Sequence, residues 1–142
     1  PASHVGTSIE QVRKGGNAKI YAYVHAAVGD FERSAKSARK DLFNYAMADG
    51  YARMFSQAGF ADEIKELRAR QAEKDREGAL AAVSDRMIQA IDFIGNKSEV
   101  TNFVKDYVKA GVEHPVLMPL PWGEDRRAIT DATMSAAIKA VT

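Results

Sequence analysis

Residues 94–121 read IGNKSEVTNFVKDYVKAGVEHPVLMPLP, and this stretch decides the fold class. Asn96 stands three residues before Glu99, which is the spacing of a helix-opening capping box. The apolar residues that follow recur at helical intervals, and Gly111 marks the end of the predicted helix. A short apolar run, Val116–Met118, then ends at two prolines, which predicts a short buried strand. A helix followed by a buried strand is the alternation of an α/β protein.

A second strand is predicted upstream, at residues 18–28, where β-branched and aromatic residues lie between two turn signals. Neither face of this strand is polar throughout, which is typical of a parallel sheet covered on both sides. Asp30 is the predicted N-cap of a helix that continues to about Ala48. Residues 1–7 are expected to be irregular, and residues 61–74 to form an exposed, charged helix. A last helix begins at Asp125.

The chain is expected to be a single mostly helical α/β domain, residues 1–142, with two parallel strands and about six helices. Its formal net charge is +1, and its only basic patch is small and flanked by acidic residues, so no nucleic-acid partner is predicted. It contains no cysteine, no membrane-spanning run and no signal-peptide pattern. The default expectation is therefore a cytoplasmic protein without a membrane partner.

No motif identifies a catalytic residue or a metal site. The three histidines, His4, His25 and His114, are far apart in the sequence, and none has a ligand-spaced partner, so no metal is predicted. The chain has no phosphate-binding glycine loop and no nucleophile elbow. Carboxylates are frequent between residues 62 and 77, but they alternate with Lys and Arg, as on a solvated helix face. The one small basic patch, on the predicted helix after Asp30, is flanked by Glu32 and Asp41; it consists of Arg33, Lys36, Arg39 and Lys40.

Taken in order, several segments resemble the C-terminal part of the luciferase-like monooxygenase family. They are the strand ending in Gly29-Asp30, the run Asp75-Arg76-Glu77-Gly78-Ala79-Leu80, the pair Glu99-Val100, and the segments Tyr107–Val112 and Pro115–Pro119. The likeness extends over roughly residues 16–140. It implies the C-terminal portion of a (β/α)8 barrel, with residues 18–28 as the seventh strand and residues 116–120 as the eighth.

The resemblance also implies an oxidoreductase that uses reduced FMN or a deazaflavin (coenzyme F420). In a barrel, chemistry lies at the carboxyl ends of the strands, so His25 is a candidate for contact with the cofactor. Trp122, in the loop after the last strand, is a candidate to stack on a cofactor or substrate ring. Arg126 and Arg127 begin the last helix and could meet a phosphate there.

The length of the chain conflicts with a complete barrel, which takes about 250 residues. The expectation is therefore a fragment of a larger enzyme, or a short relative rebuilt as a mostly helical domain. Uncovered strand edges and apolar faces predict self-association, or pairing with the missing N-terminal half of the barrel. The alternative is a non-enzymatic helical module derived from the same fold, which binds a partner protein through its apolar helix faces.

Overall fold

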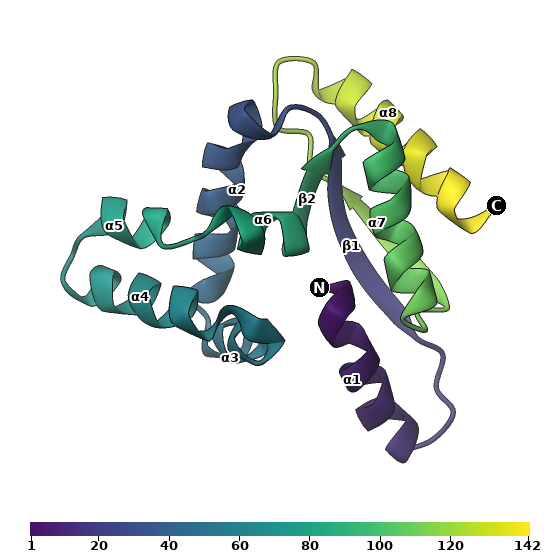
Figure 1. Cartoon of the computed structure of the whole chain (residues 1–142), viewed down its shortest axis with the longest axis horizontal. Coiled ribbons are helices and arrows are strands. Elements are labelled where there is room, and N and C mark those ends of the chain that lie inside the picture. Colours follow the sequence, from purple (N-terminus) through teal and green to yellow (C-terminus); the bar gives the residue numbers. More distant parts are fainter.

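The computed structural model describes all 142 residues and contains a three-stranded sheet surrounded by helices (Figure 1). The elements in chain order are α1 (Ala2–Lys14), β1 (Tyr21–Val28), α2 (Phe31–Ala46), α3 (Asp49–Phe55), the π-helical turn η1 (Ser56–Phe60), α4 (Ala61–Ala72), α5 (Arg76–Ala81), α6 (Asp85–Ile91), β2 (Asp92–Gly95), α7 (Lys97–Lys109), β3 (His114–Pro119) and α8 (Arg126–Val141). No helix is both long enough and apolar enough to cross a membrane.

All three strands are parallel, in the order β2-β1-β3, so the predicted parallel sheet is confirmed. Helices α2 and α6 lie on one side of the sheet, and α7 and α8 lie on the other (Figure 1). The strands do not close into a barrel. In a barrel each strand neighbours the next one along the chain, whereas here β1 lies between the two others, as in an open doubly wound sheet.

The core is divided between the two sides of the sheet. On one side, α2 contributes Ala38, Leu42 and Ala46 to a large cluster that also contains Ala27 of β1 and Ile94 of β2. On the other side, smaller clusters join the alternate residues of β1 to α7 and α8. The alternation of a strand sends successive side chains to opposite faces, so β1 serves both parts of the core.

Three predictions about elements were wrong. The strand β2 was not predicted, because Ile91 and Ile94 continue the helical spacing of the preceding apolar residues. The first residues form a helix, α1, which is stabilised by packing Val5 and Ile9 beside the α7 side of the sheet. Finally, β3 is an edge strand whose alternate residues are exposed rather than a buried strand. Each outcome depends on contacts distant in sequence, which local patterns do not report.

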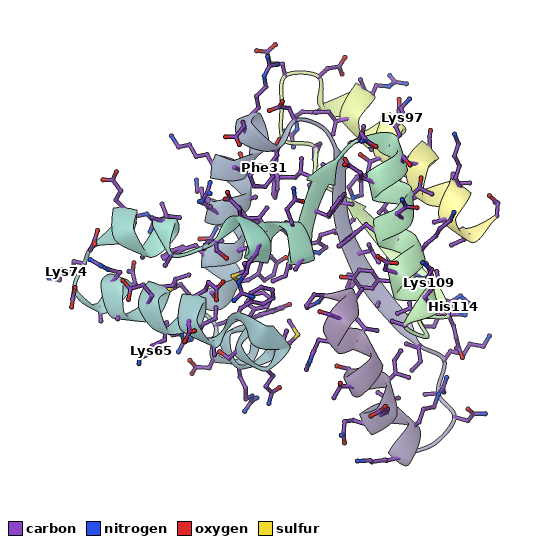
Figure 2. The ribbon with its side chains drawn as sticks, viewed as in Figure 1. Phe31, Lys65, Lys74, Lys97, Lys109 and His114 are labelled. Atoms are coloured by element: carbon purple, nitrogen blue, oxygen red, sulfur yellow. The ribbon has the colours of Figure 1, made fainter.

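The charged segment forms the predicted exposed helix, α4, with the i,i+4 pair Arg70–Glu66 at 2.6 Å. Ile64 and Leu67, its only large apolar residues, are buried in the core. Lys65, on this helix, and Lys74, in the turn that follows it, extend away from the molecule (Figure 2). The interpretation of this segment as a solvated face is consistent with its place at the periphery.

The predicted capping box at the start of α7 is present. The Asn96 side chain accepts hydrogen bonds from the backbone N–H groups of Ser98 (2.9 Å) and Glu99 (3.0 Å). The Glu99 carboxylate in turn accepts from the backbone N–H of Asn96 at 2.7 Å. At the far end, Gly111 has φ of 103°, a conformation that favours glycine and ends the helix.

We expect Asn96→Ala to lower the free energy of unfolding by about 1 kcal/mol, because two helix N–H groups lose their acceptor. Equilibrium unfolding in urea measures this change. Ser98→Ala is the matched control, since its exposed side chain makes no capping bond. Equal losses in the two variants would contradict the assignment of the cap.

Candidate functional site

A histidine–aspartate pair lies across two neighbouring strands. His25 of β1 and Asp92 of β2 are register partners in the parallel sheet, so their side chains project from the same face. His25 Nδ1 lies 3.0 Å from Asp92 Oδ1. The Asp92 side chain is completely buried, whereas that of His25 is 22% exposed. The hydrogen bond to Asp92 raises the pKa of His25 above its ordinary value, and burial opposes this shift.

Asp41 of α2 is the third member of the cluster. One ligand atom from each of His25, Asp41 and Asp92 lies within 4.8 Å of the others. Burial, followed by the negative charge of Asp92, raises the pKa of Asp41 to about 6. The second carboxylate oxygen of Asp92, Oδ2, is buried and has no hydrogen-bond partner when Asp41 is ionised, whereas a protonated Asp41 can donate a hydrogen bond to the Asp92 carboxylate. Such an unpaired buried acceptor is unfavourable, so it indicates an incompletely satisfied polar site.

Two tyrosines complete the surroundings. Tyr45 lies one helical turn after Asp41 on α2, and its ring centroid is 6.2 Å from that of His25. Tyr51 of α3 makes an edge contact with Tyr45 at 4.8 Å. Burial, followed by the nearby charge of Asp41, raises the pKa of Tyr45. The hydroxyl is therefore a neutral donor or acceptor at neutral pH.

The cluster borders a part of the sheet that no helix covers. Tyr21 and Tyr23 of β1 are 62% and 68% exposed, and Val116 and Met118 of β3 are 38% and 43% exposed. Because His25 pairs with Met118 in register, these side chains share one face. We call these four residues the uncovered face. Soluble proteins rarely expose a continuous apolar patch without a function for it.

The amino end of the uncovered face is closed by a stacked ring pair. The His114 ring stacks on that of Tyr21 with centroids 4.4 Å apart. Figure 2 shows His114 close to Lys109, where α7 ends and β3 begins. His114 therefore lies at the start of a strand, outside the cluster of His25, Asp41 and Asp92.

The structure places the four predicted cofactor residues in two separate regions. His25 is in the cluster just described. Trp122 packs against the core cluster on the α2 side, and its carbonyl accepts a hydrogen bond from Ser34 at 3.5 Å. Arg126 and Arg127 are exposed at the start of α8. No hydrogen bond or ion pair joins His25 to the other three.

Sequence reasoning missed Asp41, Asp92 and Tyr45. Asp92 lies in the strand that was predicted as helix, and Asp41 is one charged residue among several on α2. The three cluster residues have no motif spacing, since they come from three different elements. One signal was available in the sequence. Asp41 and Tyr45 are four residues apart, so they lie on the same face of α2, next to the residues that face the core.

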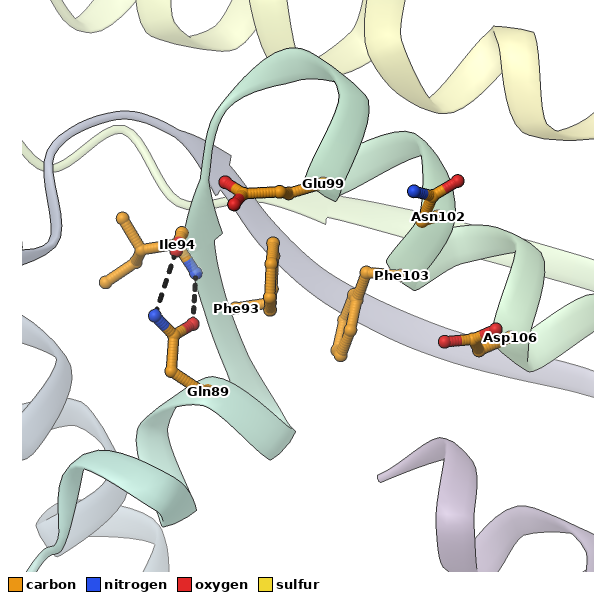
Figure 3. Close-up of a pocket in the computed structure, with 7 residues that line it drawn as sticks. All are labelled: Gln89, Phe93, Ile94, Glu99, Asn102, Phe103 and Asp106. Carbon is orange, nitrogen blue, oxygen red and sulfur yellow. Dashed lines mark hydrogen bonds between the residues drawn. The ribbon is translucent and has the colours of Figure 1, made fainter.

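Figure 3 shows a groove of about 360 Å³ between β2 and α7. Phe93, which lines it, points to the opposite face of β2 from Asp92. Phe93 and Phe103 form its floor, with their rings stacked at 4.6 Å. At one end, the Gln89 side chain makes two hydrogen bonds, of 3.1 and 3.2 Å, with the backbone of Ile94. Gln89 thereby pairs with the backbone N–H and C=O of Ile94 at the free edge of β2.

The raised pKa of Asp41 predicts that the free energy of unfolding decreases as the pH rises. The pKa of Asp41 is higher in the folded protein, about 6, than its ordinary value of 3.8. The folded state therefore binds this proton more tightly. The stabilisation is complete below pH 3.8 and is lost as the pH rises through 6. The raised pKa of His25 acts in the same direction.

We expect the protein to lose about 1–2 kcal/mol of unfolding free energy between pH 4.5 and 7, after allowance for the partial exposure of Asp41. Asp41→Asn should flatten this dependence. Urea unfolding in a chelator-containing buffer at several pH values measures it. If the unfolding free energy of Asp41→Asn depended on pH as steeply as that of the original protein, another titrating group would cause the dependence.

Comparison with known protein families identifies the family of this chain. The model of the luciferase-like monooxygenase family matches residues 2–114, which is most of the chain and includes β1, β2 and the His25–Asp41–Asp92 cluster. The protein belongs to this family, whose activity is that of an oxidoreductase. Trp122, Arg126 and Arg127 lie beyond the matched residues. No curated protein and no solved structure matches the chain.

Proposed function

We propose that the chain is the C-terminal part of a flavin- or deazaflavin-dependent oxidoreductase and derives from the end of the family's barrel. Members of the family generally use flavin-type cofactors. The proposal rests mainly on the position of His25, which is hydrogen-bonded to the buried carboxylate of Asp92 and lies beside the uncovered face. A histidine oriented in this way can hold or release a proton next to a bound ring.

The uncovered face fits a planar cofactor. Tyr21 and Tyr23 offer aromatic rings, and Met118 offers a polarisable side chain next to His25 in register. When bound, the reduced cofactor supplies hydride transfer or oxygen activation. The residues of this chain would orient it. Asp92 fixes Nδ1 of His25, which leaves Nε2 as the nitrogen that carries the exchangeable proton.

The two arginines fit a phosphate less closely. Asp125 caps α8 by accepting from the backbone N–H of Ala128 at 2.9 Å, so its carboxylate already occupies that end of the helix. Arg127 also lies 3.9 Å from Asp131. A cofactor phosphate would therefore contact the Arg126 and Arg127 guanidinium groups rather than free backbone N–H groups.

The source protein provides the test. An antibody against this chain would determine its size in a lysate of the source, and the captured protein would be examined for bound flavin or deazaflavin by absorbance and mass spectrometry. The proposal predicts a band at about twice 15.5 kDa or more, carrying one of these cofactors. A band at 15.5 kDa that neither contains nor binds FMN or F420 would overturn it and favour the interaction module.

The isolated chain offers a second readout through quenching of cofactor fluorescence. If FMN or F420 binds the uncovered face, Tyr23→Ser should weaken binding several-fold, because it removes an exposed ring from that face. Lys36→Ala, on the solvent side of α2, is the matched control. Equal affinities in the two variants would place the cofactor elsewhere.

We further expect the isolated chain to self-associate. The edge strand β3 presents unpaired backbone groups beside the apolar uncovered face, and both favour pairing with another chain. Size-exclusion chromatography with light scattering should give a dimer or larger species, and Val116→Lys should shift it toward monomer. A well-folded monomer at high concentration would contradict this expectation.

A further inference from the structure

We propose that His25, Asp41 and Asp92 form a binding site for one divalent transition-metal ion, with Zn²⁺ as the ion that the donor set fits best. The site shares His25 and Asp92 with the cofactor proposal, and a bound ion would replace the hydrogen bond between them, but its test does not require the cofactor. Its three donors come from β1, α2 and β2, so the tertiary fold assembles them.

The geometry of the donors suits such an ion. His25 Nδ1 and Asp92 Oδ1 are 3.0 Å apart in the hydrogen-bonded pair, a little less than the roughly 3.4 Å between two ligands that each lie about 2.0–2.2 Å from a tetrahedral ion, so a slight opening of the pair would admit one. All three donor atoms lie within 4.8 Å of one another, which is close enough for them to converge on one ion. One imidazole nitrogen with two carboxylates is a zinc ligand set, whereas Mg²⁺ and Ca²⁺ prefer oxygen donors alone.

The burial of Asp92 is the independent observation that points to a cation. Its side chain is completely buried, and Oδ2 has no hydrogen-bond partner. A carboxylate in this state is costly unless a positive charge compensates it. Within the cluster, a protonated His25 contributes one positive charge against two carboxylates, and the amino group of Pro1 acts on His25 from outside the cluster. A divalent ion bound between the three side chains would balance both carboxylates and take the unused oxygen as a ligand.

An ion can reach the cluster from solvent. The His25 side chain is 22% exposed, and Asp41 is only partly buried. The neighbouring Tyr23, on the uncovered face, is exposed and leaves that side open. Three protein ligands leave a fourth position for water or for an oxygen atom of a bound molecule, which is the arrangement of reactive rather than purely structural zinc sites.

The test is calorimetric titration of the chelator-treated 142-residue chain with Zn²⁺, together with the visible absorption of bound Co²⁺. We expect one saturable site of roughly micromolar affinity or tighter. His25→Gln and Asp41→Asn should each weaken it at least tenfold, because each removes one of three ligands. His114→Gln, a histidine outside the cluster, should bind as the original protein does.

Both cluster variants change partly exposed side chains, so they are expected to stay folded, and circular dichroism checks this. Absence of saturable Zn²⁺ binding would overturn the proposal. So would binding that survives both cluster variants, or binding that His114→Gln abolishes, because the ion would then lie elsewhere. None of these readouts depends on a flavin-type cofactor, so the metal site can fail while the oxidoreductase proposal stands, and the reverse.

Discussion

Asp92→Ala should lower the free energy of unfolding by about 3 kcal/mol. The substitution removes the partner of His25 and leaves a partly buried imidazole without its hydrogen bond. It also leaves a small void where the completely buried Asp92 side chain was. Relief of the repulsion between Asp92 and Asp41 offsets part of this loss. Urea unfolding followed by circular dichroism measures the change.

Asp106→Ala is the matched control for this substitution. Asp106 is a carboxylate on α7 whose side chain is 57% exposed, and its contact with Lys109 is a surface pair. We expect it to change stability by less than about 0.5 kcal/mol. A similar effect of both substitutions would mean that the His25–Asp92 pair does not stabilise the fold.

Leu42→Ala should cost about 3 kcal/mol, because Leu42 is completely buried at the centre of the α2 stripe. The residue belongs to the large core cluster that joins α2 to the sheet and to the α4–α6 segment. Its loss creates a cavity that the rigid sheet cannot close. Differential scanning calorimetry should show a lower Tm for this variant, with the same unfolded baseline.

Lys36→Ala, on the exposed side of the same helix, controls for helix propensity. Alanine is the better helix former, so this change should be neutral or slightly stabilising. If Leu42→Ala were equally mild, the helices after α2 would pack too loosely to hold Asp41 against the sheet. The geometry of the cluster would then lose its support.

Local signals predicted the elements whose sequences carry their own start and end. The capping box at Asn96, the N-cap at Asp30 and the stop at Gly111 each act within one helical turn, so they could be found without a structure. The strand β1 was predicted for the same reason, because its composition and turn signals are local. The family was also identified from the sequence, from the order of the segments that resemble its other members.

The candidate site was only partly predictable. His25 was identified because it lies on a predicted strand, but the residues that define its chemistry, Asp41 and Asp92, were not. Asp92 joins His25 only through the pairing of β2 with β1, and β2 is four residues long. Trp122 was predicted to contact a cofactor, and the structure shows it against the core. Sequence spacing contains no information on which strands become neighbours.

The sequence by itself determined the α/β class, most helix boundaries, the parallel direction of the strands and the family. These properties follow from hydrophobic periodicity, capping and chain connectivity, which act over short distances. Only the tertiary structure decided the order β2-β1-β3, the exposure of Tyr23 and Val116, and the assembly of His25 with two carboxylates. Those properties depend on which surfaces find a partner, and burial is a property of the whole fold.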